Sequence, residues 1–512
     1  MADKILIIDF GGQYTHLIKR NIRELRIDVE VIPASLSISE ISSKKPNGII
    51  LSGGPNSVYD KNAPHVSDEL FDMNIPILGI CYGMQLIAHM LGGEVERGTK
   101  REYGPSMLFV DRENDPLFFG ITSPQRVWMS HSDLVTKLPQ GFVSIAHTRE
   151  TPFAAIRHKD LPIYGVQFHP EVSHTPCGKD LLYNFVYKIA GCKSDFAMED
   201  FIEKNIEKIR EKVGDDIVIG ALSGGVDSTV ASVLVYKAIG KRLKLVFVDT
   251  GLMRFGDTEK IEYLKKTLGL DIEIIDSSSR FLKALRGVLD PEEKRKIIGH
   301  MFIEVFEEFA KRHKDAKWLL QGTIYPDVIE SAKINTSNPH LIKSHHNVGG
   351  LPEDMGLKLL EPIRELFKDE VRVLGKELGI PEDILMAHPF PGPGLAVRII
   401  GEVTPERVDI LKRVDKIYIE ELKKHKQYEK IWQAFSVLLP IKSVGVAGDE
   451  RAYKFVVALR AVLSRDGMTA DWARIPYDIL EEISLRITNE VPEIGRVVYD
   501  ITPKPPGTIE WE

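Results

Sequence analysis

Short runs of apolar, largely β-branched residues alternate with amphipathic segments along this chain, and that alternation limits the folds open to it. The runs are residues 4–8, 48–51, 76–80, 217–222 and 243–248. Each is followed by a glycine-rich turn and then by apolar residues at helical spacing. A strand that leads through a turn into a helix is the repeating unit of parallel sheets. The sequence therefore predicts an α/β protein built on parallel sheets.

The length of the chain predicts more than one domain. A single hydrophobic core rarely extends over 512 residues. The charge-rich segment 193–213 carries apolar residues at helical spacing and is interpreted as a helical linker, and the proline- and glycine-rich run 389–394 marks a second boundary. We expect two parallel-sheet α/β domains, 1–190 and 191–390, followed by a smaller α+β domain, 391–512.

Composition excludes several classes of protein. The formal net charge of −7 argues against nucleic acid as the main partner, which usually requires a basic face. The three cysteines, Cys81, Cys177 and Cys192, are too few for a disulfide framework and indicate a reducing compartment. The N-terminus does not resemble a signal peptide, and the most apolar stretch, 75–91, is interrupted by polar residues. We expect a cytoplasmic protein with no membrane partner.

Cys81 lies between an apolar run and a helical pattern, with glycines two residues away on both sides. This is the cysteine form of a nucleophile elbow, in which small neighbours permit a strained turn. A thiolate nucleophile requires an imidazole and a group that orients it, and the string Gln167-Phe-His169-Pro-Glu171 supplies both. The turn Ser52-Gly-Gly54-Pro offers N–H groups for an oxyanion hole. Alternatively, Cys81 and His169 are buried core residues, but the coincidence of three motifs favours catalysis.

These motifs resemble the class I (triad) glutamine amidotransferase family. The resemblance implies that Cys81 is the nucleophile, His169 the base and acid, and Glu171 the orienting carboxylate. It further implies an oxyanion hole formed by the N–H groups of Gly54 and Tyr82, and a glutamine site formed by Gln85, Ser132 and Asp133. No partner is apparent for Cys177 or Cys192, and both are expected to be structural.

A second motif follows the strand predicted at 217–222. The string Ser223-Gly224-Gly225-Val226-Asp227-Ser228 leads into a helix predicted at 229–239. Glycine N–H groups and hydroxyls at a helix start bind anions, but the lysine of the usual P-loop is missing. The string resembles the signature of the ATP pyrophosphatase family, which implies cleavage of ATP to AMP and pyrophosphate. The resemblance implies ATP contacts from residues 223–228 and Thr229, with Asp227 beside Mg²⁺.

Further polar residues follow the next predicted strands. Asp249 is expected either to contact the nucleoside of ATP or to cap a helix. Gly322 begins a third strand end that carries Asp327 and Glu330, which hold Mg²⁺ or form a solvated helix face. The stretch 331–351 has no clear periodicity and is interpreted as a lid, with Lys343 within reach of phosphate.

Four longer sequence segments indicate which molecule accepts the ammonia. They begin at Pro291, Lys343, Pro389 and Lys504. With the domain order, they make the chain similar to the glutamine-hydrolysing GMP synthetase family. This resemblance implies that XMP is adenylated on its C2 oxygen and that ammonia then displaces AMP to give GMP. It implies XMP recognition by Arg295, Lys504 and Glu510, and a homodimer formed through the C-terminal domain. The tail 504–512 would fold back to the nucleotide site, the alternative being a frayed end.

Two other functions share the phosphate loop. Glutamine-dependent NAD synthetases usually carry a nitrilase-like glutaminase instead of a His-Pro-Glu triad. A tRNA-modifying or RNA-binding protein would be expected to have a more basic composition and paired Cys-x-x-Cys motifs. Glutamine, ATP and XMP are therefore the expected small-molecule partners, with Mg²⁺ as cofactor.

Overall fold

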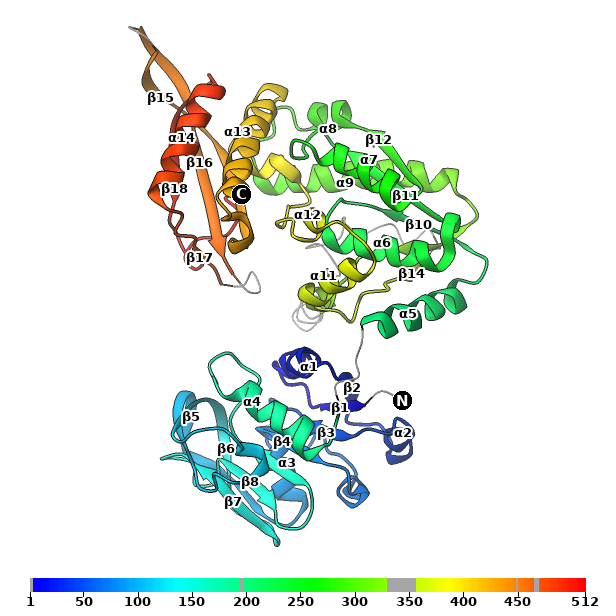
Figure 1. Cartoon of the computed structure of the whole chain (residues 1–512), viewed down its shortest axis with the longest axis vertical. Helices are drawn as coiled ribbons and strands as arrows, with labels where there is room; N and C mark the ends of the chain where they lie inside the picture. Colours follow the sequence, from blue (N-terminus) through cyan, green and yellow to red (C-terminus); the bar gives the residue numbers. More distant parts are fainter. Residues whose placement is uncertain (1–2, 194–197, 329–355, 448–449, 465–468) are drawn as a thin grey trace. The chain divides into compact units, whose positions relative to one another are not determined.

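The computed structural model describes residues 3–193, 198–328, 356–447, 450–464 and 469–512. The chain divides into two compact units, Met1–Asp200 and Phe201–Glu512 (Figure 1). The predicted boundary at 190/191 lies near this division, whereas the predicted boundary at 390/391 lies inside the second unit. In the described ranges, the first unit contains one sheet, and the second contains two.

The first unit contains a nine-stranded sheet of order β2-β1-β3-β4-β9-β8-β7-β5-β6. Its parallel half comprises β1 Lys4–Asp9, β2 Asp28–Pro33, β3 Gly48–Leu51, β4 Ile77–Ile80 and β9 Ile163–Val166. Its antiparallel half comprises β5 Glu94–Val110, β6 Gln125–Lys137, β7 Phe142–His147 and β8 Ala155–His158. The predicted parallel strands are thus confirmed, and the antiparallel extension is an addition to the prediction.

Helices bury both faces of the parallel half. Ile5 and Ile7 of β1 belong to the core that includes α1, and Leu6 and Ile8 belong to the core that includes α3. Because successive strand residues point to opposite faces, a strand buried on both sides reads as a continuous apolar run. The helices are α1 Thr15–Glu24, α2 Ile38–Ser43, α3 Tyr82–Met90 and α4 Gly178–Tyr183, with short helices η1 Asp68–Met73, η2 Pro116–Phe118 and η3 Asn184–Ile189.

The second unit contains a five-stranded, all-parallel sheet of order β12-β11-β10-β13-β14. Its strands are β10 Ile217–Ala221, β11 Leu243–Asp249, β12 Ile272–Asp276, β13 Ala316–Leu320 and β14 Lys358–Leu360. Its helices are α5 Met198–Val213, α6 Val226–Ile239, α7 Asp257–Leu268, α8 Ser278–Ala284, α9 Pro291–Arg312, α11 Lys368–Glu377 and α12 Glu382–Leu385, with η4 Gly240–Arg242. The predicted strands at 217–222 and 243–248 are confirmed.

The last part of the chain forms a mainly antiparallel sheet with two long helices. β15 Gln433–Ala447 pairs antiparallel with β16 Glu450–Leu463, which also pairs with β17 Asp471–Trp472 and, in parallel, with β18 Ile494–Asp500. The helices are α13 Pro405–Lys424 and α14 Tyr477–Glu490, with η6 Gly394–Arg398 and η7 Tyr428–Lys430. In Figure 1, β18 runs beside β16, and α14 packs against β18 and α13.

One hydrophobic core runs through this second unit. It joins Ile219 of β10 and Val246 of β11 to Leu411 of α13, Leu438 of β15 and Ile483 of α14. Buried apolar surface is therefore shared between the parallel sheet and the C-terminal sheet, and this explains why the two fold as one compact unit.

Candidate active sites

The backbone at Cys81 has the strained geometry of an elbow. Its φ is 52°, a left-handed value that is uncommon for a residue with a side chain, and α3 starts at the next residue. A Cβ at Gly79 would lie 2.6 Å from the backbone of Gly83, and one at Gly83 would lie 2.3 Å from the carbonyl oxygen of Leu51. Both glycines are required for β3, β4 and α3 to approach closely enough to form this turn.

His169 lies beside the cysteine, and Glu171 lies beside His169. The Nδ1 of His169 is 2.8 Å from the carboxylate of Glu171, and both side chains are buried. The backbone N–H of His169 donates to the Trp128 carbonyl, and the ring of Tyr14 meets the imidazole edge-on at 5.0 Å. Burial disfavours the charged imidazole, but the Glu171 carboxylate and the Cys81 sulfur outweigh it and raise the pKa of His169. The geometry places an imidazole between a sulfur with which it can exchange a proton and a carboxylate that can orient it.

A cavity of about 730 Å³ opens onto this group. Its walls include Cys81, His169 and Gly54, together with Gln85, Ser132 and Asp133. A Cβ at Gly54 would lie 3.0 Å from the carbonyl oxygen of Phe10 and 3.3 Å from the ring of Tyr82, so the turn packs tightly onto the elbow. The structure thus places the residues predicted for the triad, the oxyanion hole and glutamine binding around one cavity or directly beside it.

The residues predicted to bind glutamine are partly engaged with one another. Gln85 is buried, and its Nε2 donates to the backbone carbonyl of Asp133 at 2.7 Å. The hydroxyl of Ser132 lies 3.0 Å from that of Tyr103 on the neighbouring strand. Gln85 therefore supports the cavity wall, while β6 presents Ser132 and Asp133 at the rim.

The other two cysteines are buried thiols. Burial raises the pKa of Cys177 to about 11 and that of Cys192 to about 12. Both therefore remain protonated near neutral pH, which agrees with the structural role expected for them.

The predicted phosphate loop connects β10 to α6. Gly224 has a φ of 76°, and the helix begins at Val226, three residues before the predicted start. The hydroxyls of Ser223 and Ser228 are 2.9 Å apart, and the hydroxyl of Thr229 donates to the carbonyl of Gly225 at 2.8 Å. The loop thus gathers hydroxyls and helix-terminal N–H groups at the carboxyl end of a parallel sheet, where anions bind.

The polar residues predicted at the neighbouring strand ends are less directly connected to the phosphate loop. The Asp249 carboxylate accepts from the Gly251 N–H at 2.8 Å and from the Thr258 hydroxyl at 2.9 Å, so it organises its own loop. A Cβ at Gly322 would lie 3.0 Å from the backbone N of Ser228. The absence of a side chain therefore lets the third strand end approach the phosphate loop closely. Asp327 accepts from the Ile324 N–H at 2.9 Å. Glu330 and Lys343, with the predicted lid, lie outside the described residues.

Lys368 contacts the acid of the phosphate loop, and the sequence did not predict it. Its Nζ lies 2.8 and 2.7 Å from the two carboxylate oxygens of Asp227. The two residues are 141 positions apart in the sequence, and Lys368 is the first residue of α11, in the charged run Lys368-Asp-Glu, so no local motif links it to the loop. The contact places a cation beside the acid of the loop, where phosphate and metal charges would be balanced.

The residues predicted to bind XMP lie on or near the C-terminal tail. Arg295 of α9 donates to the backbone oxygen of Glu512. Glu510 is held by Arg398, whose Nε and Nη2 lie 3.0 and 2.8 Å from its carboxylate. Lys504 exchanges two backbone hydrogen bonds with Ala470. The tail is therefore docked on the second unit in this structure, contrary to the frayed-end alternative.

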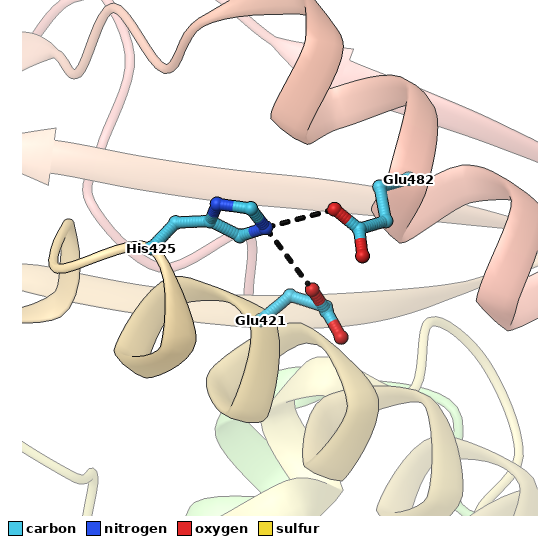
Figure 2. Close-up of side chains that lie close together, drawn as sticks. All are labelled: Glu421, His425 and Glu482. Carbon is cyan, nitrogen blue, oxygen red and sulfur yellow. Dashed lines mark hydrogen bonds and ion pairs between the residues drawn. The ribbon is translucent and has the colours of Figure 1, made fainter.

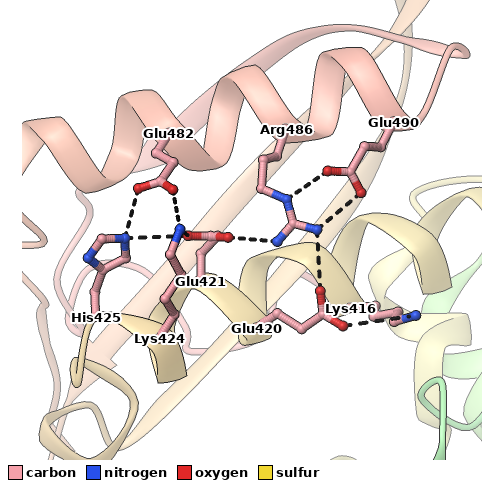
Figure 3. Close-up of polar contacts among 8 residues, drawn as sticks. All are labelled: Lys416, Glu420, Glu421, Lys424, His425, Glu482, Arg486 and Glu490. Carbon is pink, nitrogen blue, oxygen red and sulfur yellow. Dashed lines mark hydrogen bonds and ion pairs between the residues drawn. The ribbon is translucent and has the colours of Figure 1, made fainter.

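A group of possible metal ligands lies elsewhere, between α13 and α14. The donor atoms of Glu421, His425 and Glu482 lie within 4.8 Å of one another (Figure 2). Among the described residues, these three form the cluster whose geometry could hold a metal ion. Lys424 pairs with both carboxylates, and Arg486 donates to Glu421 at 2.6 Å. Figure 3 shows the network continuing to Glu420, Glu490 and Lys416. Because cationic side chains already neutralise the carboxylates, we interpret this group as an ion-pair network that joins the two helices.

Among the helices in the described ranges, none combines the length and the apolar character needed to cross a bilayer.

Comparison with known proteins follows the division of the chain. Residues 6–189 match the profile of the family described as "Glutamine amidotransferase class-I". Residues 196–296, which include the phosphate loop, match the "NAD synthase" profile, and residues 420–511 match the "GMP synthase C terminal domain" profile.

Curated relatives match over the whole chain. A protein of Carboxydothermus hydrogenoformans named GMP synthase [glutamine-hydrolyzing] is 55% identical over 100% of both chains. Proteins of the same name from Aquifex aeolicus and Nitratiruptor sp. are each 56% identical over 99% of both chains.

Proposed function

The chain belongs to the family of glutamine-hydrolysing GMP synthases, and from that membership and the geometry above we propose how its residues divide the reaction. The enzyme takes an amino group from glutamine and uses ATP to make GMP. The observation that carries the proposal is the buried Cys81–His169–Glu171 group at a strained elbow, which opens onto a cavity of about 730 Å³. In one chain it accompanies a phosphate loop without the P-loop lysine.

In the glutaminase step, the Cys81 thiolate attacks the side-chain amide carbon of glutamine. His169 protonates the leaving nitrogen, so that ammonia departs and a thioester remains. The N–H groups of Gly54 and Tyr82 stabilise the oxyanion. Water, activated by His169, then hydrolyses the thioester to glutamate, while Glu171 keeps the imidazole oriented. Gln85, Ser132 and Asp133 form the wall and rim that hold the substrate.

In the synthetase step, the C2 oxygen of XMP attacks the α-phosphate of ATP and pyrophosphate leaves. Ammonia then adds at C2 and AMP departs, which gives GMP. Residues 223–229 grip the departing pyrophosphate, and Gly322 keeps the third strand end against them. Arg295 and Lys504 suit the phosphate of XMP, and Glu510 suits a purine N–H or a ribose hydroxyl. Asp249 positions the loop at the nucleoside end.

A magnesium ion is the proposed cofactor of this step. The Asp227 carboxylate lies in the first turn of α6, beside the phosphate loop, and oxygen donors suit Mg²⁺. Lys368 pairs with both of its oxygens in this structure and would have to release at least one of them to the ion. Asp227 would hold the ion with Asp327 and Glu330. When bound, the ion would neutralise charge on the phosphate oxygens.

The fusion of two activities follows from the chemistry of their shared intermediate. Ammonia is mostly protonated near neutral pH and is then not nucleophilic. The adenylated carbonyl oxygen is hydrolysed if water reaches it. Placing both sites in one chain limits both losses when glutamine cleavage responds to the state of the synthetase site.

We also propose that the C-terminal sheet forms a homodimer and that the enzyme works in the cytoplasm. Val444 and Tyr453 face each other across β15 and β16, and they are 47% and 68% exposed, respectively; Ile441 is 57% exposed. Exposed apolar side chains on adjacent strands are typical of a protein interface. Light scattering of the wild type and of Tyr453→Glu tests the dimer, which the substitution should dissociate.

Two variants test the division of roles. Cys81→Ala should abolish GMP synthesis from glutamine and preserve synthesis from ammonium at alkaline pH, because the synthetase site needs only NH₃. Asp227→Asn should lower both activities by orders of magnitude, because it removes a charge beside the phosphates. The measurement is GMP, AMP and pyrophosphate release with XMP as acceptor. A folded Cys81→Ala enzyme that has lost both activities, or a fully active Asp227→Asn enzyme, would contradict the proposal.

A further inference from the structure

A buried glutamine side chain, Gln167, lies against the sulfur of Cys81. Its residue surface is 0% exposed, and its Nε2 lies 3.7 Å from Sγ, within the range of an N–H···S hydrogen bond. The backbone N–H of Gln167 donates to Ala154 at 2.8 Å, which fixes the segment just after β9. Gln167 and His169, two residues apart, thus both contact the sulfur.

The hydrogen bonds around Gln167 determine which end of its amide faces the sulfur. The Asp133 backbone oxygen can only accept, so the atom of Gln85 that lies 2.7 Å from it must be the amide nitrogen. The same nitrogen lies 3.3 Å from Oε1 of Gln167 and has a second N–H to donate. Since Oε1 accepts this bond, the NH₂ group of Gln167 is the end that faces Cys81.

This arrangement has different consequences for the thiol and the thiolate. The Ser130 carbonyl oxygen lies 3.8 Å from Sγ and can accept only from a protonated sulfur. After deprotonation that bond is lost, whereas the Gln167 N–H remains available to donate to the anion. Donation to a charged acceptor is stronger than to a neutral one. The Gln167 contact therefore favours the nucleophilic form of Cys81 and fixes its position.

We propose that Gln167 is a positioning residue that holds the Cys81 thiolate for attack on glutamine, and that Gln85 holds Gln167 in turn. The relay runs from the Asp133 backbone on β6 through two amides to the sulfur. It therefore links the strand that lines the substrate cavity to the nucleophile. The inference rests on the proposed role of Cys81, and it assigns Gln85 to the support of the nucleophile.

The test measures the reactivity of Cys81 in the full-length enzyme without any substrate. Iodoacetamide alkylation of Cys81 is followed by peptide mass spectrometry across a pH series. Gln167→Met removes the donor at similar volume, and Gln167→Glu replaces it with a carboxylate that repels the thiolate. For Gln167→Met we expect an alkylation profile displaced to higher pH and a glutaminase kcat lower by roughly ten- to a hundred-fold. Gln167→Glu should show a larger loss, with little change in KM for either variant.

Asn184→Leu is the matched control. Asn184 is a buried amide of the same unit that donates to Leu117 and Phe119 at 3.1 and 2.8 Å. Its loss should lower stability and leave the alkylation profile of Cys81 unchanged. An unchanged profile in Gln167→Met, or an equal displacement in Asn184→Leu, would overturn the inference.

A second variant keeps the test decisive if Gln167→Met does not fold. Gln85→Leu should displace the profile in the same direction, and Gln85→Leu with Gln167→Glu should match Gln167→Glu alone, because Gln85 acts through Gln167. Additive losses would remove Gln85 from the relay. Failure of the proposed function is seen separately, as glutamine-dependent GMP synthesis that survives Cys81→Ala.

Discussion

At the scale of single residues, the glutaminase site depends on a backbone that only small neighbours permit. Cys81 adopts a φ of 52°, and such conformations cost of order 1–3 kcal/mol unless the surroundings impose them. Here the surroundings are Leu51 of β3, Gly83 of α3 and the Val166 carbonyl, to which the Cys81 N–H donates at 2.8 Å. The nucleophile is therefore positioned by strand–helix packing as well as by its catalytic partners.

Gly83→Ala tests this dependence. The added methyl group would lie 2.3 Å from the Leu51 carbonyl oxygen, so β3 and α3 must separate. We expect a loss of about 2–4 kcal/mol in stability of the first unit and a glutaminase activity that falls with it, while ammonia-dependent synthesis persists. Thermal unfolding and the two activities are measured together. Gly299→Ala, where a Cβ meets nothing within 4 Å, is the control, and normal glutaminase in Gly83→Ala would refute the argument.

Glu102 gives a prediction for acidic pH. Burial acts to raise the pKa of its carboxyl, but the His131 ring, whose Nε2 lies 3.5 Å away, and hydrogen bonds from the Thr151 and Ser106 hydroxyls lower it from 4.5 to about 2. A pKa lowered by folding contributes stability that is present above the unfolded value and is lost as pH falls toward the folded value. The wild type should therefore lose stability between about pH 5 and pH 2 that Glu102→Gln does not lose. We expect the wild type to lose about 1–2 kcal/mol more of its free energy of unfolding than Glu102→Gln does, after allowance for screening by solvent.

Hydrogen exchange of peptides from β5 and β6, corrected for intrinsic rates, measures this difference. Glu113→Gln, a substitution at an exposed carboxylate of the same unit, is the control. Parallel pH profiles for the wild type and Glu102→Gln would show that the carboxylate does not contribute as argued.

The sequence predicts residues that belong to a motif and misses those that join a site from elsewhere. Cys81, His169 and Glu171 were predicted because nucleophile chemistry needs their types and because local strings present them. Gln167 stands inside one of these strings, yet an amide in a strand end carries no signal of its own. Lys368 and Arg398 contact Asp227 and Glu510 across 141 and 112 positions. Such pairs arise from tertiary packing, which no local pattern encodes.

At the scale of elements, strands were easier to predict than their neighbours. Buried parallel strands such as β1, β3 and β11 read as apolar runs, and the structure confirms them. The long antiparallel strand β6 alternates buried with partly buried residues over 127–131, and no tight-turn signal joins it to β5, so neither strand was predicted. α6 begins earlier than predicted because the extended Gly225 is its N-cap, which makes Val226–Ser228 part of the helix.

The ion-pair network between α13 and α14 gives a prediction at this scale. Glu421 is 2% exposed, and Arg486 donates to it at 2.6 Å. Arg486→Met should lower the free energy of unfolding by about 1–3 kcal/mol, because a buried carboxylate loses its best donor. Arg474→Met, which breaks the exposed pair with Asp471, should change stability by less than about 0.5 kcal/mol. Denaturant unfolding compares them, and equal losses would show that burial of Glu421 does not matter.

At the scale of the whole molecule, the tail is part of the second unit's interior. Arg460 is 1% exposed and donates to the carbonyls of Thr502, Thr508 and Ile509 at 2.8–2.9 Å. Lys294 is 0% exposed and contacts the Glu512 carboxylate at 2.5 Å. Deleting residues 504–512 would remove the Thr508 and Ile509 carbonyls from Arg460 and the Glu512 carboxylate from Lys294, so two buried cations would lose part of their acceptors and the second unit would be destabilised. Loss of activity in such a truncation would therefore not distinguish recognition of XMP from unfolding, and substitutions of single side chains are needed.

Arg398→Lys is the substitution that separates the two. Arg398 is fully buried and holds both carboxylate oxygens of Glu510, and Gln433 adds a bond to one of them at 2.9 Å. Lysine keeps the charge but cannot hold the carboxylate through two parallel bonds. If Glu510 recognises XMP, its loss of orientation should raise the KM for XMP by roughly ten-fold or more, with the KM for ATP and basal glutaminase unchanged.

Arg460→Lys is the matched control, because it weakens an equally buried guanidinium that holds the tail through Asp500 and backbone carbonyls and leaves the Glu510 carboxylate in place. We expect Arg460→Lys to lower the unfolding temperature and to change the KM for XMP much less than Arg398→Lys does. Glu510→Gln should reproduce the kinetic effect of Arg398→Lys, and combining the two should add little, since one acts through the other. Equal KM changes in the two arginine variants would mean that XMP binding depends on the docked tail in general. A normal KM in Glu510→Gln would remove that carboxylate from the XMP site.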